Sequence, residues 1–169
     1  LRGALGEIRH RWVRPEDAEL LLAMIGCVLR QHGSLGSLWK SLDDDSEETV
    51  LPTLGRFVAA IQAMPVDPLQ QRARVARRAD DKSHELPSIT SILLTSPDRG
   101  SACKRMNLFL RWMVRPADGV DLGLWSEFVS ASRLVMPVDV HVMRFCRKLR
   151  LTRRPNPDQQ SAHEITRRF

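Results

Sequence analysis

The sequence has few of the features that mark metal sites, membrane spans or secretion. Its three cysteines, Cys27, Cys103 and Cys146, are widely spaced and form no Cys-x-x-Cys pair, so neither a zinc knuckle nor an iron–sulfur cluster is supported. All three lie in apolar helical patterns, which favours buried, reduced thiols. No apolar run reaches the roughly 18 residues that a membrane span needs, and no stretch resembles a signal peptide. We therefore expect a cytoplasmic protein with no metal and no cofactor.

Strand signals and internal repeats are also scarce, so we expect an all-α fold. The 169 residues suffice for one domain with a sizeable core, but not comfortably for two. Apolar content of 43% and charged content of 27% are ordinary for a globular protein. The chain begins at Leu1 rather than Met and ends within a helical pattern. We therefore expect residues 1–169 to form a single helical domain that is truncated at both ends.

The charge is basic and unevenly distributed. The formal net charge is +6, which is a weak indication of a polyanionic partner. The acids gather between Asp43 and Glu48, and the bases crowd residues 72–82 and the region from Arg99 onward. The acidic run is best interpreted as a solvated loop, with the acid-rich first turn of a helix as the alternative. The basic cluster is interpreted as a solvated face unless it borders a nucleic-acid groove.

Hydrophobic periodicity predicts several helices. Those with the clearest patterns are expected at residues 16–30, 34–42, 51–64, about 102–114, from Asp139 onward, and finally up to Phe169 with Asp158 or Ser161 as its cap. Pro116 is expected to end the helix over 102–114, because proline has no N–H to donate. Residues 79–85 are expected to form a loop. The run over residues 89–94 is too short for periodicity to decide between helix and strand.

Asp139 is the first candidate for chemistry. It follows Pro137 and stands directly before an apolar-periodic run that contains Val142, Phe145 and Cys146, so it is expected to cap a helix. A carboxylate at a helix start has a fixed position and stays ionised, because N–H groups and the helix dipole favour its charge. Such a group suits the stabilisation of a positive charge or the steering of a water. An ordinary cap is the alternative.

Lys104 is the second candidate. Lys104, Asn107, Arg111 and Arg115 follow one another by three, four and four residues, which predicts a polar stripe on the helix over 102–114. An amine that attacks a sugar carbon must be neutral some of the time, and cationic neighbours or partial burial favour that state. Arg105 is adjacent and Arg111 is two turns away, so the surroundings are suitable. The alternative is an exposed lysine with no chemical role.

The segments Ser96–Arg115 and Pro137–Val142 closely resemble an uncharacterised bacterial family, domain-of-unknown-function family twenty-four-hundred. The resemblance extends over the whole chain and is specific between Ser96 and Leu149. That family is in turn distantly similar to the helix-hairpin-helix Gly-Pro-Asp DNA glycosylases of the endonuclease III type. Those enzymes carry a Pro-Val-Asp-Thr-His-Val-like sequence, and Val140 stands here in place of its threonine.

This resemblance implies a bacterial, nucleoid-associated DNA repair protein of the base-excision type that acts on double-stranded DNA with an oxidised purine such as 8-oxoguanine. Asp139 would stabilise the oxocarbenium-like sugar or orient the nucleophile. Lys104 would be the amine that displaces the base and forms a Schiff base with the opened sugar. Two alternatives belong to other classes: a non-catalytic helical DNA-binding module, and a helical interaction protein with an exposed apolar patch.

Other residues are expected to contact DNA, each with a structural role as its alternative. Arg105, Arg111 and Arg144 would meet phosphates, and His141 would orient the cap or a phosphate. Trp125 would stack on an extruded base, because an enzyme that acts on a base inside a duplex must flip it out.

Two features depart from the glycosylase pattern. The usual Leu-Pro-Gly-Val-Gly hairpin is absent and only Pro97–Ser101 stands in its place, which weakens a phosphate anchor made of backbone N–H groups. Lys104 and Asp139 are 35 residues apart. This separation is longer than in endonuclease III-like enzymes and resembles that of the archaeal 8-oxoguanine branch.

Overall fold

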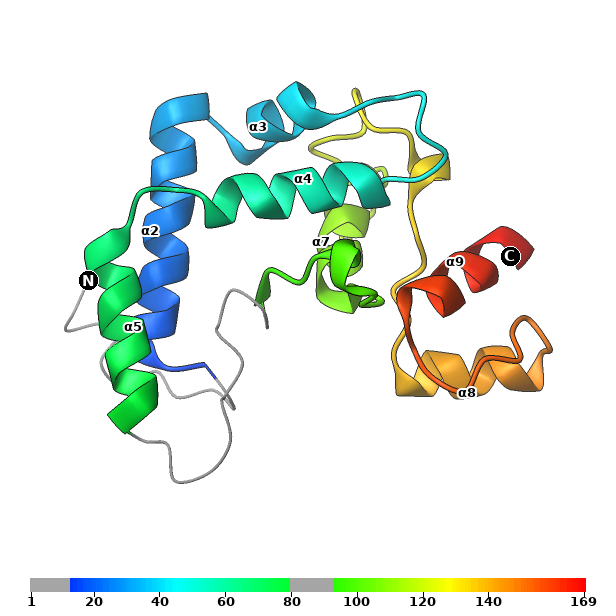
Figure 1. Cartoon of the computed structure of the whole chain (residues 1–169). Helices are drawn as coiled ribbons and strands as arrows, with labels where there is room; N and C mark the ends of the chain where they lie inside the picture. The colour runs from blue at the N-terminus through cyan, green and yellow to red at the C-terminus, as the bar shows by residue number, and fades with distance from the viewer. Residues whose placement is uncertain (1–12, 80–92) are drawn as a thin grey trace. The chain divides into compact units, whose positions relative to one another are not determined.

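The protein is all-helical in the part of the chain that its computed structural model describes, residues 13–79 and 93–169 (Figure 1). This part contains seven α-helices and no strand, although one isolated β-bridge joins Ser101 and Asp158. The all-α prediction is therefore confirmed. Most of the loop expected over residues 79–85 and most of the run over 89–94 lie outside the described residues, as do the side chains of Arg74, Arg77 and Arg78.

The chain divides into two compact units. The first comprises residues 1–38 and 59–94, and the second comprises residues 39–58 and 95–169. No helix in the described residues is long and apolar enough to cross a membrane.

The first unit contains two packed helices, α2 (Pro15–His32) and α5 (Asp67–Ala79). Helix α2 begins at a proline and has two acids in its first turn, which suit the positive end of the helix dipole. Leu20, Met24 and Val28 recur every four residues and are buried. Gly33, with a φ of 78°, ends the helix and donates its N–H to the carbonyl of Leu29. The helix predicted at 16–30 is confirmed.

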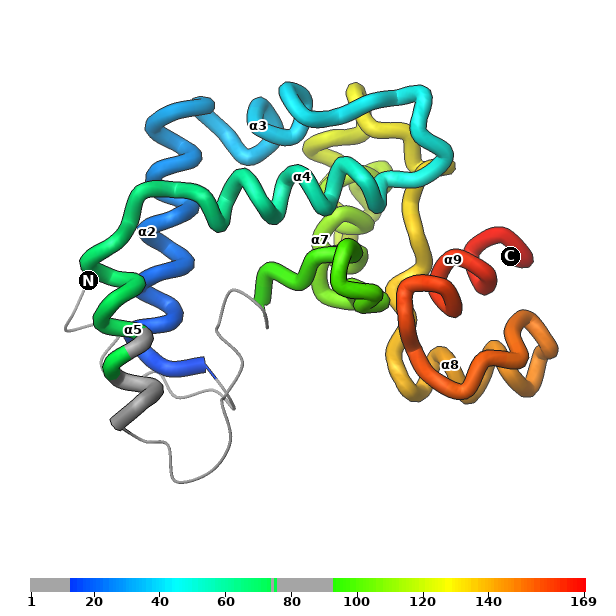
Figure 2. Tube along the Cα trace, in the orientation of Figure 1, coloured from blue at the N-terminus to red at the C-terminus, as the bar shows by residue number. Residues whose placement is uncertain are grey.

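The second unit holds α7 (Lys104–Val114), α8 (Val140–Lys148) and α9 (Gln159–Arg168), whose order along the chain can be followed in Figure 2. It also holds residues from the end of α3 (Leu35–Leu42) and the start of α4 (Leu51–Gln62). Its core contains Trp39, Phe57 and Leu110, each with almost no exposed surface. Of the two caps predicted for the last helix, Asp158 is the one that accepts the N–H of Ser161 at 2.7 Å.

The acidic run between α3 and α4 is solvated only in part: Asp44, Asp45 and Glu48 are exposed, as the sequence interpretation expects, whereas Asp43 and Glu47 are paired with arginines. Arg133 is only 7% exposed, and its guanidinium donates to both oxygens of Asp43 at 2.9 and 3.0 Å. Burial raises the pKa of Asp43, but hydrogen bonds from Arg133 and Thr53 outweigh that effect, so the pKa is lowered. Glu47 pairs with Arg56 at 2.8 Å. The partner of Asp43 comes from a segment 90 residues away, which local charge patterning does not reveal.

Candidate functional site

The structure brings Lys104 and Asp139 together. Lys104 is the first residue of α7, and its Nζ atom lies 2.7 Å from Oδ2 of Asp139, the N-cap of α8. The other carboxylate oxygen, Oδ1, accepts the backbone N–H groups of His141 at 2.9 Å and Val142 at 2.8 Å. Both oxygens are therefore engaged, one by a side-chain amine and the other by two backbone N–H groups. The capping role predicted for Asp139 is confirmed.

The carboxylate is strongly held in its charged form. The hydrogen bond from Lys104, together with the backbone N–H groups of Val142 and His141, lowers the pKa of Asp139 to about 2. The Lys104 side chain is 45% exposed and that of Asp139 is 26% exposed, so the pair is open to a ligand. A fixed negative charge next to a reachable amine is chemically suited to stabilise a developing cation.

A strained backbone sets the position of Lys104. The residue before it, Cys103, has a φ of 46°, in the left-handed region that side chains rarely adopt. Cys103 is buried, and its Sγ atom donates to the carbonyl of Thr95 at 3.5 Å. One turn further, the buried Asn107 amide donates to the carbonyl of Ala102 at 3.0 Å. These contacts hold the chain on the N-terminal side of Lys104. Burial raises the pKa of the Cys103 thiol, which favours the neutral thiol.

The predicted phosphate contacts differ in their surroundings. Arg144 is exposed, and it has no ion pair in the described part of the chain. His141 is exposed on the first turn of α8. Arg105 is exposed on α7. Arg111 instead donates to the buried carboxylate of Asp121 at 3.3 and 3.4 Å, so part of its hydrogen-bonding capacity has a structural use.

Trp125 lies in the core, and this corrects its predicted role as a stacking platform. Its side chain is only 4% exposed. Four rings surround it at centroid distances between 5.4 and 6.3 Å, those of Trp39, Phe57, Phe109 and Phe128. A base has no open face of Trp125 on which to stack. Three of these rings come from distant segments, so helical spacing near Trp125 does not predict the enclosure.

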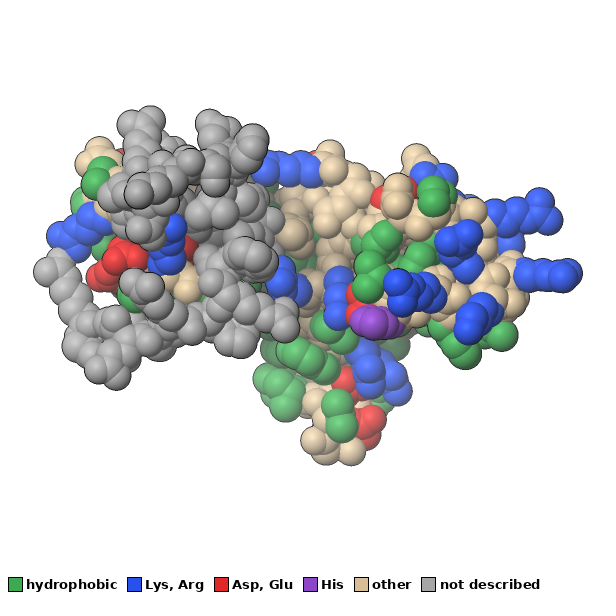
Figure 3. Space-filling view, turned by 90° about the horizontal axis from the view of Figure 1, so that it is seen from below, with side chains coloured by type: hydrophobic (Ala, Val, Ile, Leu, Met, Phe, Trp, Pro, Cys, Tyr) green, Lys and Arg blue, Asp and Glu red, His purple; other side chains and the backbone are tan. Residues whose placement is uncertain are grey.

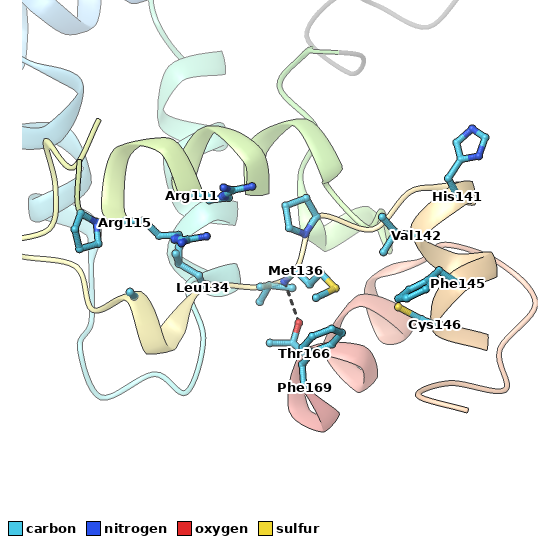
Figure 4. Close-up of a pocket in the computed structure, with 14 residues that line it drawn as sticks. Arg111, Arg115, Leu134, Met136, His141, Val142, Phe145, Cys146, Thr166 and Phe169 are labelled. Carbon is cyan, nitrogen blue, oxygen red and sulfur yellow. Dashed lines mark hydrogen bonds between the residues drawn. The ribbon is translucent and has the colours of Figure 1, made fainter. Parts of the chain in front are cut away.

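An open pocket of about 780 Å³ lies at the start of α8 (Figure 4), and neither Lys104 nor Asp139 is among its lining residues. Pro137, His141 and Val142, the near neighbours of Asp139 in the sequence, line it together with residues of α7 and α9. The pocket also contains two phenylalanines that sequence reasoning did not single out, Phe145 and Phe169, which are 59% and 75% exposed. Phe145 fell on the predicted apolar stripe of its helix, a pattern that normally indicates burial.

The turn that replaces the glycine hairpin satisfies its own N–H groups. Pro97–Arg99 forms a 3₁₀ turn after Ser96. The N–H of Asp98 donates to the Ser96 hydroxyl, and that of Gly100 donates to the carbonyl of Pro97. The carbonyl of Gly100 accepts the N–H of Gln159 at 3.0 Å. This arrangement leaves the N–H groups of Asp98 and Gly100 unavailable to a phosphate, in line with the weakened anchor expected from the sequence.

The fold and the site define an all-helical protein in which a lysine amine and a helix-capping carboxylate form an accessible pair. The family model described as "Protein of unknown function (DUF2400)" matches residues 2–169, so the chain belongs to this family. No curated protein and no solved structure is similar enough to the chain to count as a match. Among the described residues, no group of three or more His, Cys, Asp or Glu side chains is placed to hold a metal ion.

Proposed function

We propose that the protein is a DNA glycosylase/lyase of the helix-hairpin-helix type that acts on an oxidised purine, such as 8-oxoguanine, in double-stranded DNA. The observation that carries the proposal is the 2.7 Å contact between Lys104 and Asp139. The resemblance of Pro137–Val142 to the glycosylase motif assigns chemistry to Asp139, and the resemblance to the bifunctional glycosylases assigns the amine to Lys104. A contact across 35 residues was not required by the sequence, and separation of the two groups would have ruled the mechanism out.

The proposed reaction begins with the neutral amine of Lys104. Its lone pair forms a bond to the C1′ atom of the flipped nucleotide, the glycosidic C1′–N bond breaks, and the electron pair leaves with the base. The base takes up a proton, and the amine attached to C1′ loses one. The nitrogen lone pair then forms a C=N bond as the C1′–O4′ bond breaks and O4′ is protonated. The product is a Schiff base on Lys104, from which strand incision follows.

Asp139 is suited to electrostatic stabilisation in this scheme. A carboxylate with a pKa of about 2 is a weak proton acceptor near neutral pH, but it keeps its full negative charge. It therefore stabilises the positive charge that develops on the sugar as the base departs. The ion pair between Lys104 and Asp139 represents the resting form, because an ammonium group has no lone pair. The Lys104 proton must leave after DNA binds.

A non-catalytic DNA-binding module is the second candidate, and the Pro97–Gly100 turn favours it. The N–H groups of Asp98 and Gly100 are used inside the turn, so the backbone anchor of the helix-hairpin-helix enzymes is weakened. In that case the Lys104–Asp139 pair would only tie the start of α7 to the start of α8. A helical interaction protein is the third class.

Borohydride trapping on a duplex that contains 8-oxoguanine separates these functions. Reduction of a Schiff base yields a stable protein–DNA adduct, which we expect for the wild type. Lys104→Arg keeps a cation opposite Asp139 but removes the primary amine, so the adduct should disappear while DNA binding persists. Asp139→Asn should keep the helix cap and reduce adduct formation by at least ~100-fold, because it removes the charge that stabilises the sugar cation.

The matched control is Lys40→Gln, which removes an exposed lysine on α3 outside the pair. Adduct formation by this variant should equal that of the wild type. If the wild type forms no adduct but binds DNA with a strong salt dependence, the non-catalytic module is the better description. If it binds no DNA, both nucleic-acid functions are wrong.

A further inference from the structure

The surface formed by α8, the segment that follows it and the end of α9 carries more positive charge than its acidic side chains neutralise. Five exposed cations lie between residues 144 and 153, and this stretch contains no acid: Arg144, Arg147, Lys148, Arg150 and Arg153. None of the five has a side-chain hydrogen bond or ion pair with any residue that the structure describes. Figure 3 shows Lys and Arg side chains gathered on the face that carries α8, with apolar side chains between them.

The excess of positive charge is confined to this stretch, because the neighbouring cations are paired with acids. Arg154 pairs with Asp158 at 3.0 Å, Arg167 with Glu48 at 2.7 Å and Arg168 with Glu164 at 3.2 Å. The acids of this region are therefore already paired with other cations. The five cations between residues 144 and 153 have no acid left to neutralise them, so their charge is available to an anionic partner.

Two exposed aromatic rings belong to the same surface. Phe145 and Phe169 line the pocket of about 780 Å³ together with the buried Val135 and Cys146 (Figure 4). Residues three and four apart on a helix are neighbours, so Lys148 lies beside Phe145 and Arg144 lies beside Lys148. The helix thus places phenylalanine and cations along adjoining stripes.

We propose that this surface, made of the pocket and the five cations, binds single-stranded DNA without regard to sequence. Exposed rings provide stacking platforms for bases, and unpaired Lys and Arg side chains track the phosphates, which together are the chemistry of single-strand binding. A duplex hides the faces of its bases inside the stack, so only an unpaired strand offers a π-face to Phe145 and Phe169. The pocket is mainly apolar, as a surface that stacks on base faces requires.

This site stands independently of chemistry at Lys104. It does not use Lys104 or Asp139, and it concerns an unpaired strand rather than a damaged base in a duplex. It also supplies charge for phosphate contacts where the Pro97–Gly100 turn has N–H groups that are already used. Binding at this surface should therefore be retained in Lys104→Arg.

Fluorescence anisotropy with labelled oligothymidylate tests the proposal through two double variants. Phe145→Leu with Phe169→Leu keeps apolar surface but removes both rings, so binding should weaken at least ~10-fold with little change in salt dependence. Arg144→Gln with Lys148→Gln should weaken binding and reduce the slope of log affinity against log salt by about 1.4, since each single-strand phosphate contact contributes about 0.7.

The chain offers matched controls for both double variants. Leu122→Ala with Leu124→Ala truncates two exposed apolar side chains outside the pocket, and Lys40→Gln with Arg72→Gln removes two exposed charges outside the cluster. Both should bind within about twofold of the wild type. Circular dichroism and urea unfolding verify that each variant is folded, and the altered side chains are exposed enough for this to be expected.

Several results would overturn the proposal. These are the absence of oligothymidylate binding at low salt, wild-type affinity in the double Phe→Leu variant, and tighter binding of oligouridylate than of oligothymidylate. Equal binding of vesicles rich in anionic lipid, retained by the Phe→Leu variant, would instead identify the surface as a membrane-binding one.

Discussion

The amine of Lys104 and the carboxylate of Asp139 meet at 2.7 Å, and each residue stands at the beginning of a different helix. Asp139 serves two partners at once, because one of its oxygens caps α8 and the other accepts the amine. Structural and chemical roles thus coincide in a single side chain. The two roles can be separated with variants that remove one of them and keep the other.

Substitution of Asp139 should show that capping and pairing contribute separately to stability. Asp139→Asn keeps a good N-cap but loses the charge, so it should lower the free energy of unfolding by less than ~1 kcal/mol, as expected for an exposed ion pair. Asp139→Ala also loses the cap and should cost about 1 kcal/mol more. Urea unfolding of the two variants measures the difference. Equal losses would show that the cap contributes little at this helix.

The contribution of Asp139 to stability should depend on pH in the acid range. Its pKa is about 2 in the folded protein, below the ordinary value of 3.8, so the folded state binds the proton less readily than the unfolded state. The stabilisation is therefore fully present above pH 3.8 and is lost as the pH falls through about 2. The difference in unfolding free energy between wild type and Asp139→Asn should be constant near neutral pH and shrink below pH 4. A difference that grows on acidification would contradict the assignment.

Arg133 should be far more important for stability than the exposed Arg167, although each pairs with an acid. Arg133→Met leaves the carboxylate of Asp43 without its main partner in a confined site, so a loss of about 3–5 kcal/mol is expected. Arg167→Met breaks a 2.7 Å pair with Glu48, but both side chains are more than half exposed and the loss should stay below ~1 kcal/mol. Chemical denaturation of both variants provides the comparison. Similar losses would show that burial does not govern these pairs.

Gly123 and Gly119 provide a matched test of backbone contact in the loop after α7. Both have positive φ, 68° and 89°, so an alanine at either position should cost about 1–2 kcal/mol. A Cβ on Gly123 would also lie 2.9 Å from the backbone N of Ala117, whereas one on Gly119 would meet open space. Gly123→Ala should therefore lower the melting temperature further than Gly119→Ala. An equal effect would mean that the loop shifts freely.

Short-range signals predicted the helices and the cap. The proline and acids at the start of α2, and the position of Asp139 before an apolar run, act within one or two turns of the chain. The start of α7 was predicted slightly early, at about Ala102, because the left-handed Cys103 interrupts an otherwise helical pattern. Such a break depends on burial of Cys103, which a helical pattern alone does not encode.

Long-range contacts account for what sequence reasoning missed. Trp125 is enclosed by rings from α3, α4 and α7, and Asp43 is paired by an arginine 90 residues away. Phe145 belongs to a regular apolar stripe, yet it remains exposed because the pocket between the segments around it is open. Periodicity shows which side chains share a helix face. It does not show what another segment places against that face.

The sequence by itself determined that the protein is helical, where its main helices lie and that Asp139 caps one of them, since propensity and capping are local interactions. Only the tertiary structure decided that Lys104 reaches Asp139, that Trp125 is buried and that Phe145 and Phe169 face a pocket. Those outcomes depend on packing between segments that are distant in the sequence. Interactions between residues close in the sequence determine where the helices form, and the burial of apolar surface between distant segments determines which side chains meet.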